Sequence, residues 1–171
     1  MMINIKKIIL PNSITLHKGF LDHSFCDYVA NNFKDYFEYT PRSEWNAYTL
    51  RDKNLPLYSE ILSKFSPLVD YEFITTWINV TEYTEGIDLR HHKDSESSLT
   101  IVSEISDNYT GGRFLINKES YTDDNYSIIQ LDKGDVLTFD GSKVFHGVEK
   151  VDKGTRLSLN MWTKPKDANL I

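Results

Sequence analysis

The sequence predicts a mainly β fold in which helices from the N-terminal third back a jelly-roll-like barrel or sandwich. Apolar residues recur at helical spacing in the first third, whereas short β-rich runs separated by turn residues follow from Glu72 onward. Strands and helices do not alternate in this second part, which argues against a doubly wound parallel sheet. Many short strands at close spacing favour a barrel or a sandwich.

Length and composition predict a single domain. The chain has 171 residues, 40% hydrophobic and 26% charged, which is ordinary for a globular protein with its own core. We expect one domain over residues 1–171, with helical support at about 20–68 and a strand-rich core at about 72–164. The net charge of -6 and the pI near 5.3 argue against sequence-independent binding of nucleic acid, which needs a basic surface.

The N-terminal residues and the cysteine content indicate in which cellular compartment the protein is expected. Residues 3–10 form a short apolar run that Lys6 and Lys7 interrupt, so we interpret it as a strand and not as a secretory signal or a membrane span. Cys26 is the only cysteine, so no internal disulfide can form. This usage favours a reducing compartment, and we expect a cytoplasmic protein that does not enter the membrane.

Two helices are expected in the first third. In residues 22–37, apolar side chains recur at steps of three and four after a possible cap at Asp22 or Ser24. A second helix is expected from Pro56, which is acceptable in a first turn, to Phe65. Residues 39–54 lack clear periodicity and have two interpretations. They form a loop over a site, with Trp45, Tyr48 and Arg51 as substrate contacts, or a strand pair with an ordinary connection.

The β-rich part divides into seven expected strands. These are residues 73–83, 98–105, 113–116, 127–131, 136–139, 144–151 and 155–163. The breaks between them carry turn-forming pairs such as Glu85-Gly86, Gly111-Gly112 and Asp140-Gly141.

A His-x-Asp triplet is the first candidate for chemistry. Side chains at positions i and i+2 of a strand project from the same face, so His92 and Asp94 can bind one ion together, while His91 points the other way. With His146 added, two histidines and one carboxylate form the set that binds iron(II) on one side and leaves other positions open for reaction. Taken alone, such triplets usually lie on solvated surfaces, and a single histidine such as His146 is more often hydrogen-bonded and half-buried than a metal ligand.

The last expected strand supplies a cation. Arg156, Ser158 and Asn160 share one face, and apolar residues alternate with them on the other. Beside a metal triad, Arg156 would hold an anionic co-substrate through its two-pronged guanidinium. Without the triad, Arg156 would be a surface cation paired with a nearby carboxylate.

Taken in order, these motifs resemble the 2-oxoglutarate- and iron(II)-dependent dioxygenases, and in particular their prolyl 4-hydroxylase-like branch. The likeness covers roughly residues 75–163 and consists of five ordered pieces. The pieces are Tyr83-x-x-Gly86-x-x-Leu89-x-x-His92-x-Asp94, Gly111-Gly112-Arg113-Phe114, Lys133-Gly134-Asp135-Val136-Leu137-Thr138-Phe139, His146-Gly147-Val148-Glu149 and Gly154-Thr155-Arg156-Leu157-Ser158. No such motif covers the helical first third.

The resemblance implies a double-stranded β-helix and a set of site residues. His92, Asp94 and His146 would bind Fe(II), and Arg156 would pair with the distal carboxylate of 2-oxoglutarate. Ser158 and Tyr83 are secondary candidates for hydrogen bonds to that carboxylate. For Tyr83, ordinary strand packing is the competing interpretation. Oxidative decarboxylation with O2 would give succinate, CO2 and a hydroxylated substrate, with ascorbate as the reductant.

The resemblance also indicates which type of reaction and which class of substrate to expect. Asp94 stands where a smaller residue would leave room for a halide, so hydroxylation is expected instead of halogenation. Trp162 stands six residues after Arg156, where the nucleic-acid demethylases of the family carry a second arginine. The substrate is therefore expected to be a peptide or protein, or a small molecule such as a free amino acid. A non-catalytic cupin-like barrel that binds a metal or a ligand, and a zinc hydrolase, are the alternatives.

Overall fold

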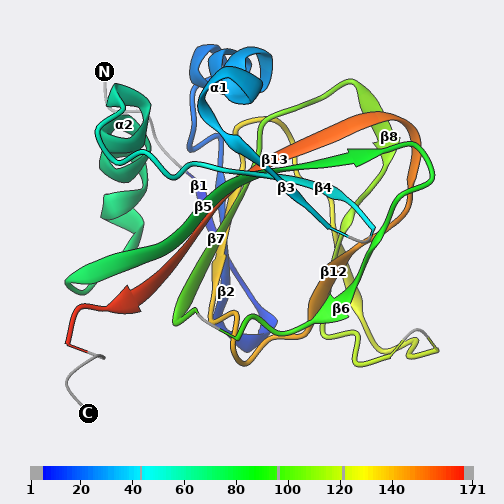
Figure 1. Ribbon diagram of the computed structural model, residues 1–171. Coiled ribbons are helices and arrows are strands. Elements are labelled where there is room, and N and C mark those ends of the chain that lie inside the picture. The colour runs from blue at the N-terminus through cyan, green and yellow to red at the C-terminus, as the bar shows by residue number, and fades with distance from the viewer. Residues whose placement is uncertain (1–5, 43, 96, 121, 168–171) are drawn as a thin grey trace.

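Two antiparallel β-sheets and two α-helices make up the computed structural model, which describes residues 6–42, 44–95, 97–120 and 122–167 (Figure 1). The fold is mainly β, as the sequence predicts, and its two sheets are consistent with a double-stranded β-helix. Residues 3–5 of the predicted N-terminal strand lie outside the described residues. No helix in the described part of the chain is both long and apolar enough to cross a lipid bilayer.

The larger sheet has the strand order β1-β2-β11-β7-β13-β5-β4-β3, and β8 pairs with one end of β13. Its strands are β1 (Lys6–Leu10), β2 (Ile14–Lys18), β3 (Glu38–Pro41), β4 (Asn46–Thr49), β5 (Phe73–Thr84), β7 (Leu99–Glu104), β8 (Tyr109–Gly111), β11 (Val136–Phe139) and β13 (Val151–Pro165). The smaller sheet has the order β10-β9-β12-β6, with β10 (Ser127–Ile129), β9 (Phe114–Ile116), β12 (His146–Val148) and β6 (Leu89–His92). Two short 3-10 helices, η1 (Pro11–Ser13) and η2 (Ser66–Leu68), complete the described elements.

The helices cover the outer face of the larger sheet. Helix α1 (His23–Tyr36) and helix α2 (Pro56–Phe65) correspond to the two helical segments that the apolar spacing predicts. Their buried side chains, among them Val29 and Ile61, pack in one apolar cluster with Val80 of β5 and Leu159 of β13. Because alternate residues of a strand face opposite sides, this packing leaves Ser158 and Asn160 of β13 facing the smaller sheet.

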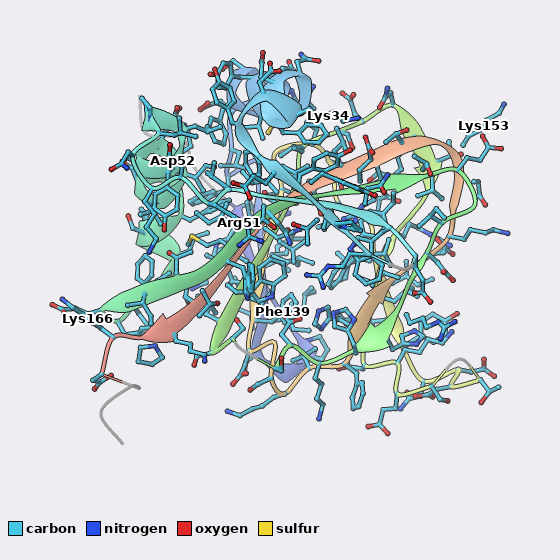
Figure 2. All side chains as sticks on the ribbon, viewed as in Figure 1. Lys34, Arg51, Asp52, Phe139, Lys153 and Lys166 are labelled. Carbon is cyan, nitrogen blue, oxygen red and sulfur yellow. The ribbon has the colours of Figure 1, made fainter. Side chains whose placement is uncertain are left out.

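A second apolar cluster lies between the two sheets. It joins side chains of β2, β9, β11 and β12, including Leu16, Phe114, Leu137 and Val148. Side chains fill this space, and the labelled Phe139 lies among them (Figure 2). The inner face of the larger sheet is therefore apolar near β2 and β11 and polar along β5 and β13, where the candidate site lies.

Several predicted boundaries are wrong. Glu38–Pro41 and Asn46–Thr49 form the antiparallel hairpin of β3 and β4, so the strand-pair interpretation is correct, and a loop over the whole of this segment is not found. The single strand predicted at 144–151 is two strands, since β12 ends at Val148 and β13 begins at Val151. Between them the chain passes from the smaller to the larger sheet, where the Glu149 N–H donates to the Arg113 carbonyl. Strands β2 and β8 were not expected from the sequence.

Candidate metal centre and adjoining pocket

Strand pairing brings three potential metal ligands together. His146 lies directly opposite His92 in the antiparallel pair of β12 and β6. Asp94 follows two residues after His92, and its Oδ1 lies 3.4 Å from His92 Nε2 and 3.6 Å from His146 Nε2. The three ligand atoms all lie within 4.8 Å of one another, close enough to hold one metal ion.

Backbone carbonyls orient both imidazoles. His92 Nδ1 lies 2.9 Å from the Arg90 carbonyl oxygen, and His146 Nδ1 lies 2.9 Å from the Val144 carbonyl oxygen. A carbonyl oxygen only accepts hydrogen bonds, so each Nδ1 carries the proton and each Nε2 of the neutral rings presents a lone pair. Both lone pairs belong to the cluster with Asp94 Oδ1, and this is the arrangement that a metal-binding imidazole requires.

Asp94 is held in place by a turn and not by strand pairing. The sequence predicts a strand through residue 94, but β6 ends at His92. The Asp94 N–H donates instead to the Gly141 carbonyl, and Thr100 Oγ1 donates to Asp94 Oδ2 at 2.6 Å. Residue 141 must be glycine, because a Cβ there would lie 2.3 Å from Asp94 Oδ2. His92 and Asp94 therefore lie together as predicted, but a turn brings them together and not a shared strand face.

Electrostatics keep the carboxylate charged. Burial by itself would raise the pKa of Asp94, but the adjacent imidazoles of His146 and His92, together with the hydrogen bond from Thr100, outweigh it and hold that pKa well below its usual range. Burial would likewise lower the pKa of His92, and the neighbouring Asp94 raises it overall. One anionic oxygen between two imidazoles is a donor set suited to a divalent transition metal. His91, which the sequence analysis treated as a bystander, is not a member of the cluster.

A narrow pocket of about 130 Å³ begins at the two histidines and extends between the sheets. The part of the pocket near the smaller sheet is lined by the apolar side chains of Leu89, Phe114 and Val148. Polar side chains of β5 and β13 line the opposite wall, and they are Asn79, Thr81, Tyr83, Arg156, Ser158 and Asn160. The alternation predicted for residues 156–160 is therefore the reason that one wall of the pocket is polar.

Arg156 is buried in this pocket with part of its hydrogen-bonding capacity unused. Only 1% of its surface is exposed, and its Nε donates to Glu104 Oε2 at 2.8 Å. Among the described residues, Nη1 and Nη2 of Arg156 have no hydrogen-bond partner. Buried polar groups are nearly always paired, so two free nitrogens on a buried cation fit a site for an anion. The surface-cation interpretation of Arg156 is wrong, and sequence reasoning missed Glu104.

Ser158 and Tyr83 lie beside Arg156 in different ways. Ser158 Oγ is 2.6 Å from Thr81 Oγ1, and Asn160 Nδ2 donates to both oxygens at 3.2 Å. Tyr83 is 2% exposed, and the guanidinium of Arg156 lies 5.4 Å from the centroid of its ring. Burial raises the pKa of Tyr83, so it is a neutral phenol that packs against the cation.

The turn between β3 and β4 reaches the same pocket. Arg42 and Trp45 line it, whereas Tyr48 and Arg51 face elsewhere. Tyr48 packs edge-on against Phe33 of α1, with ring centroids 4.8 Å apart. Of the three residues that the sequence analysis assigned to a substrate loop, only Trp45 lies at the pocket.

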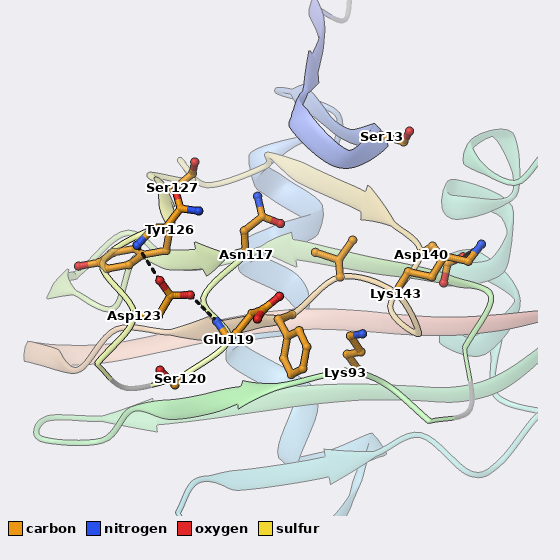
Figure 3. A pocket seen from close by; sticks show the side chains of 13 residues that line it. Ser13, Lys93, Asn117, Glu119, Ser120, Asp123, Tyr126, Ser127, Asp140 and Lys143 are labelled. Carbon is orange, nitrogen blue, oxygen red and sulfur yellow. Dashed lines mark hydrogen bonds and ion pairs between the residues drawn. The ribbon is translucent and has the colours of Figure 1, made fainter.

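A second, wider groove lies next to the cluster but contains none of its three ligands (Figure 3). Its lining is polar and comes largely from residues 117–127 and 140–145. The Asp123 carboxylate accepts hydrogen bonds from the backbone N–H groups of Glu119 and Asn125, which it holds in a turn. Lys93 lies over the Phe145 ring. These contacts organise a surface loop and give no indication of chemistry.

Comparisons with known proteins identify a family. A family model described as the 2OG-Fe(II) oxygenase superfamily matches residues 78–164, slightly more than half of the 171 residues. The matched segment contains all three residues of the cluster and Arg156. No curated protein matches the sequence significantly.

Solved structures share the fold at low sequence identity. HygX from Streptomyces hygroscopicus, with nickel and 2-oxoglutarate bound, has a TM-score of 0.73 at 12% identity over 90% of this chain and 83% of that chain. A prolyl-4-hydroxylase from Pseudomonas putida has a TM-score of 0.69 at 15% identity over 91% and 94% of the two chains. A viral collagen prolyl hydroxylase from Paramecium Bursaria Chlorella virus-1, in a 2OG complex, has a TM-score of 0.68 at 17% identity over 89% and 95%.

The hydrogen bond between Thr100 and Asp94 is expected to support metal binding. Replacing Thr100 by the isosteric valine removes the donor that fixes Asp94 Oδ2, and should lower the affinity for Co(II) about tenfold or more by calorimetry. Thr138→Val is the matched control, because Thr138 is also buried but pairs with His17, away from the cluster. Equal Co(II) affinities for Thr100→Val and the wild type would show that this hydrogen bond does not support the metal.

Proposed function

The chain belongs to the 2OG-Fe(II) oxygenase superfamily, and from this we propose that it hydroxylates a C–H bond of its substrate. Its cofactors are Fe(II) and 2-oxoglutarate. Bound Fe(II) supplies the oxidation chemistry, in which 2-oxoglutarate and O2 give succinate and CO2 and one oxygen atom enters the substrate. One observation carries the proposal. Two oriented imidazoles and a carboxylate lie at one end of a pocket, and a buried arginine with two unpaired nitrogens lines that pocket.

We assign the metal ligands to His92, Asp94 and His146. Their geometry supports this, because the Nδ1 hydrogen bonds leave both Nε2 atoms available and Thr100 leaves Asp94 Oδ1 available. His146 is buried, whereas 38% of the His92 side chain is exposed. Substrate would therefore approach from the side of His92. The apolar side chains around the cluster would keep water away from the reacting atoms.

We assign Arg156 to the distal carboxylate of 2-oxoglutarate. A carboxylate can accept hydrogen bonds from Nη1 and Nη2 together, and this would satisfy the two nitrogens that lack a partner. Ser158 Oγ lies on the same wall and is a second candidate donor. Tyr83 would act through its ring, which packs against the guanidinium. A cupin-like binding barrel or a zinc hydrolase has no use for such an anion site.

For the substrate we propose a prolyl residue of a peptide or a free amino acid. Two of the structurally similar proteins are named prolyl hydroxylases, and the turn residues Arg42 and Trp45 give the pocket one cationic and one aromatic side chain at its rim. We also propose that residues 1–171 act as one catalytic domain, since α1, α2 and the larger sheet share an apolar cluster. A succinate-forming screen of proline-containing peptides and free amino acids, with mass spectrometry for an added oxygen, identifies the substrate.

Replacing His92 by alanine should abolish the conversion of 2-oxoglutarate to succinate, because a metal ligand is lost. Succinate formation with added Fe(II) and ascorbate is the measurement, and circular dichroism checks that the fold survives. His91→Ala is the matched control, since His91 is adjacent in β6 but outside the cluster, and it should retain turnover. Undiminished turnover in His92→Ala would refute the metal assignment.

Replacing Arg156 by alanine should raise the KM for 2-oxoglutarate about 100-fold, because two charge-assisted hydrogen bonds to the co-substrate are lost. Initial rates of succinate formation at varied 2-oxoglutarate give this value. Arg113→Ala is the control, because Arg113 pairs with Glu149 and lies outside the pocket. An unchanged KM in Arg156→Ala would mean that the guanidinium does not contact 2-oxoglutarate.

Once a substrate is found, replacing Trp45 by alanine should raise the KM for that substrate and leave the affinity for 2-oxoglutarate unchanged. Trp45 lines the pocket from the turn between β3 and β4, whereas Arg156 and Ser158 line it from β13. Tyr39→Ala removes an aromatic ring from the same hairpin that does not line the pocket, so it should change neither value. Equal substrate KM values for the two variants would exclude Trp45 from substrate binding.

A further inference from the structure

The structure contains a buried carboxyl group next to Arg156, that of Glu104, for which the reaction itself has no evident use. Glu104 has no exposed surface, and its Oε2 accepts the hydrogen bond from Arg156 Nε. We infer that Glu104 is a positioning residue that turns the Arg156 guanidinium so that Nη1 and Nη2 face the pocket, and that it thereby sets the affinity for 2-oxoglutarate. This inference rests on the proposed function of Arg156.

The contact between Glu104 and Arg156 uses only one point of the guanidinium. An arginine can present Nε and one terminal nitrogen to a carboxylate together, and Arg113 does this in the same protein. Glu149 accepts from Arg113 Nε and Nη2, both at 2.7 Å. In the buried pair Glu104 accepts only from Nε. Both terminal nitrogens lack a partner with the geometry of a hydrogen bond among the described residues, although the Tyr109 side chain lies close enough to the pair to raise the pKa of Arg156. A pair that served stability alone would use the two-point geometry, because unpaired buried N–H groups cost free energy.

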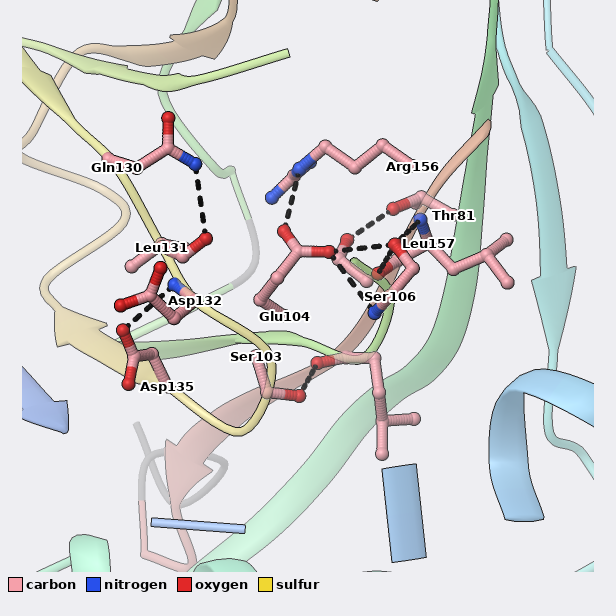
Figure 4. A network of polar contacts seen from close by, with 12 residues as sticks. Thr81, Ser103, Glu104, Ser106, Gln130, Leu131, Asp132, Asp135, Arg156 and Leu157 are labelled. Atoms are coloured by element: carbon pink, nitrogen blue, oxygen red, sulfur yellow. Dashed lines mark hydrogen bonds and ion pairs between the residues drawn. The ribbon is translucent and has the colours of Figure 1, made fainter. Parts of the chain in front are cut away.

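Glu104 is itself held rigidly from the backbone of a neighbouring strand. Its Oε1 accepts a hydrogen bond from Ser106 Oγ at 3.0 Å, and the Leu157 N–H donates to the same Ser106 Oγ at 2.7 Å (Figure 4). The carboxylate is thus linked through Ser106 to the residue that follows Arg156 in β13. Because Oε1 is occupied in this way, Oε2 is the oxygen that remains for the guanidinium.

The surroundings of Arg156 leave its stem little freedom to take another position. A Cβ on Gly112 would lie 3.2 Å from Arg156 Cδ and 3.0 Å from a methyl group of Val151, so the glycine makes room for the arginine stem. Tyr83 packs against the guanidinium. Because the stem is enclosed, the guanidinium can change its orientation only by rotation about the last bonds of the side chain. The hydrogen bond from Nε to Glu104 prevents this rotation.

The charges agree with this role. Burial would lower the pKa of Arg156, and the nearby Glu104 raises it overall, so the cation is retained. Burial raises the pKa of Glu104, against the effect of Arg156. An anionic ligand at Nη1 and Nη2 would then complete the hydrogen bonding of a cation that Glu104 has oriented in advance. Orientation in advance of binding lowers the conformational entropy that the arginine side chain loses when the ligand binds.

Two substitutions of Glu104 distinguish the effect of its position from the effect of its charge. Glu104→Gln keeps an acceptor at the same distance from Nε but removes the charge. Glu104→Asp keeps the charge but withdraws the carboxylate by one methylene, so that Nε must follow it and the terminal nitrogens must tilt. Both changes are conservative in volume, and the metal-free variants are expected to fold with a lower Tm than the wild type.

The test is the Kd of 2-oxoglutarate for the Ni(II)-loaded protein, measured by calorimetry without O2. For Glu104→Asp we expect the Kd to rise about tenfold or more, the usual size for a displaced supporting group. For Glu104→Gln we expect it to rise by less than about threefold, as for a substitution without a positional effect. Glu149→Asp shortens the two-point pair with Arg113 and should leave the Kd unchanged.

The outcomes distinguish this inference from the proposed function. A wild-type protein that binds no 2-oxoglutarate would overturn the proposed function itself. If the wild type binds and Glu104→Asp binds equally well, Glu104 has only a structural role and the inference is wrong. If Glu104→Gln weakens binding as much as Glu104→Asp, the charge of Glu104 and not its position sets the affinity, which also contradicts the inference.

Discussion

The candidate site depends on the register of one short strand pair. In the smaller sheet His146 of β12 lies opposite His92 of β6, and a shift by one residue would turn one imidazole to the other face of the sheet. Only three residues of β12 are in strand conformation, so the register must be supported from outside. The pairing of β12 with β9 on its other side supplies part of this support, since it places His146 opposite Ile116 and Val148 opposite Phe114.

The larger sheet supplies the other half of the site through the two faces of β13. Leu159 and Met161 are buried against the helices, which fixes the strand. The alternate residues Arg156, Ser158 and Asn160 therefore face the pocket, where Arg156 meets Glu104 of the neighbouring β7. The pocket thus has the proposed metal ligands at the smaller sheet and the proposed anion-binding arginine on the larger one. Apolar side chains line the wall at the smaller sheet, and polar side chains of β5 and β13 line the opposite wall.

The sequence predicted these components to different degrees. Spacing alone identified α1, α2 and the alternating faces of β13, because those elements bury one face each. The three ligands were predicted from a strand argument that holds for His92 but not for Asp94, which a turn and Thr100 position. Glu104 gave no signal, since a glutamate within a strand is ordinarily solvated. Its partner is distant in sequence and meets it only through the pairing of β7 with β13.

A crystal structure of the protein with Fe(II) and 2-oxoglutarate, obtained without O2, tests the central claim most directly. The account predicts one ion within about 2.2 Å of His92 Nε2, His146 Nε2 and an oxygen of Asp94, as for other first-row divalent metals. It also predicts the distal carboxylate of 2-oxoglutarate at Nη1 and Nη2 of Arg156. An ion bound elsewhere, or a 2-oxoglutarate molecule that leaves those two nitrogens unpaired, would contradict it.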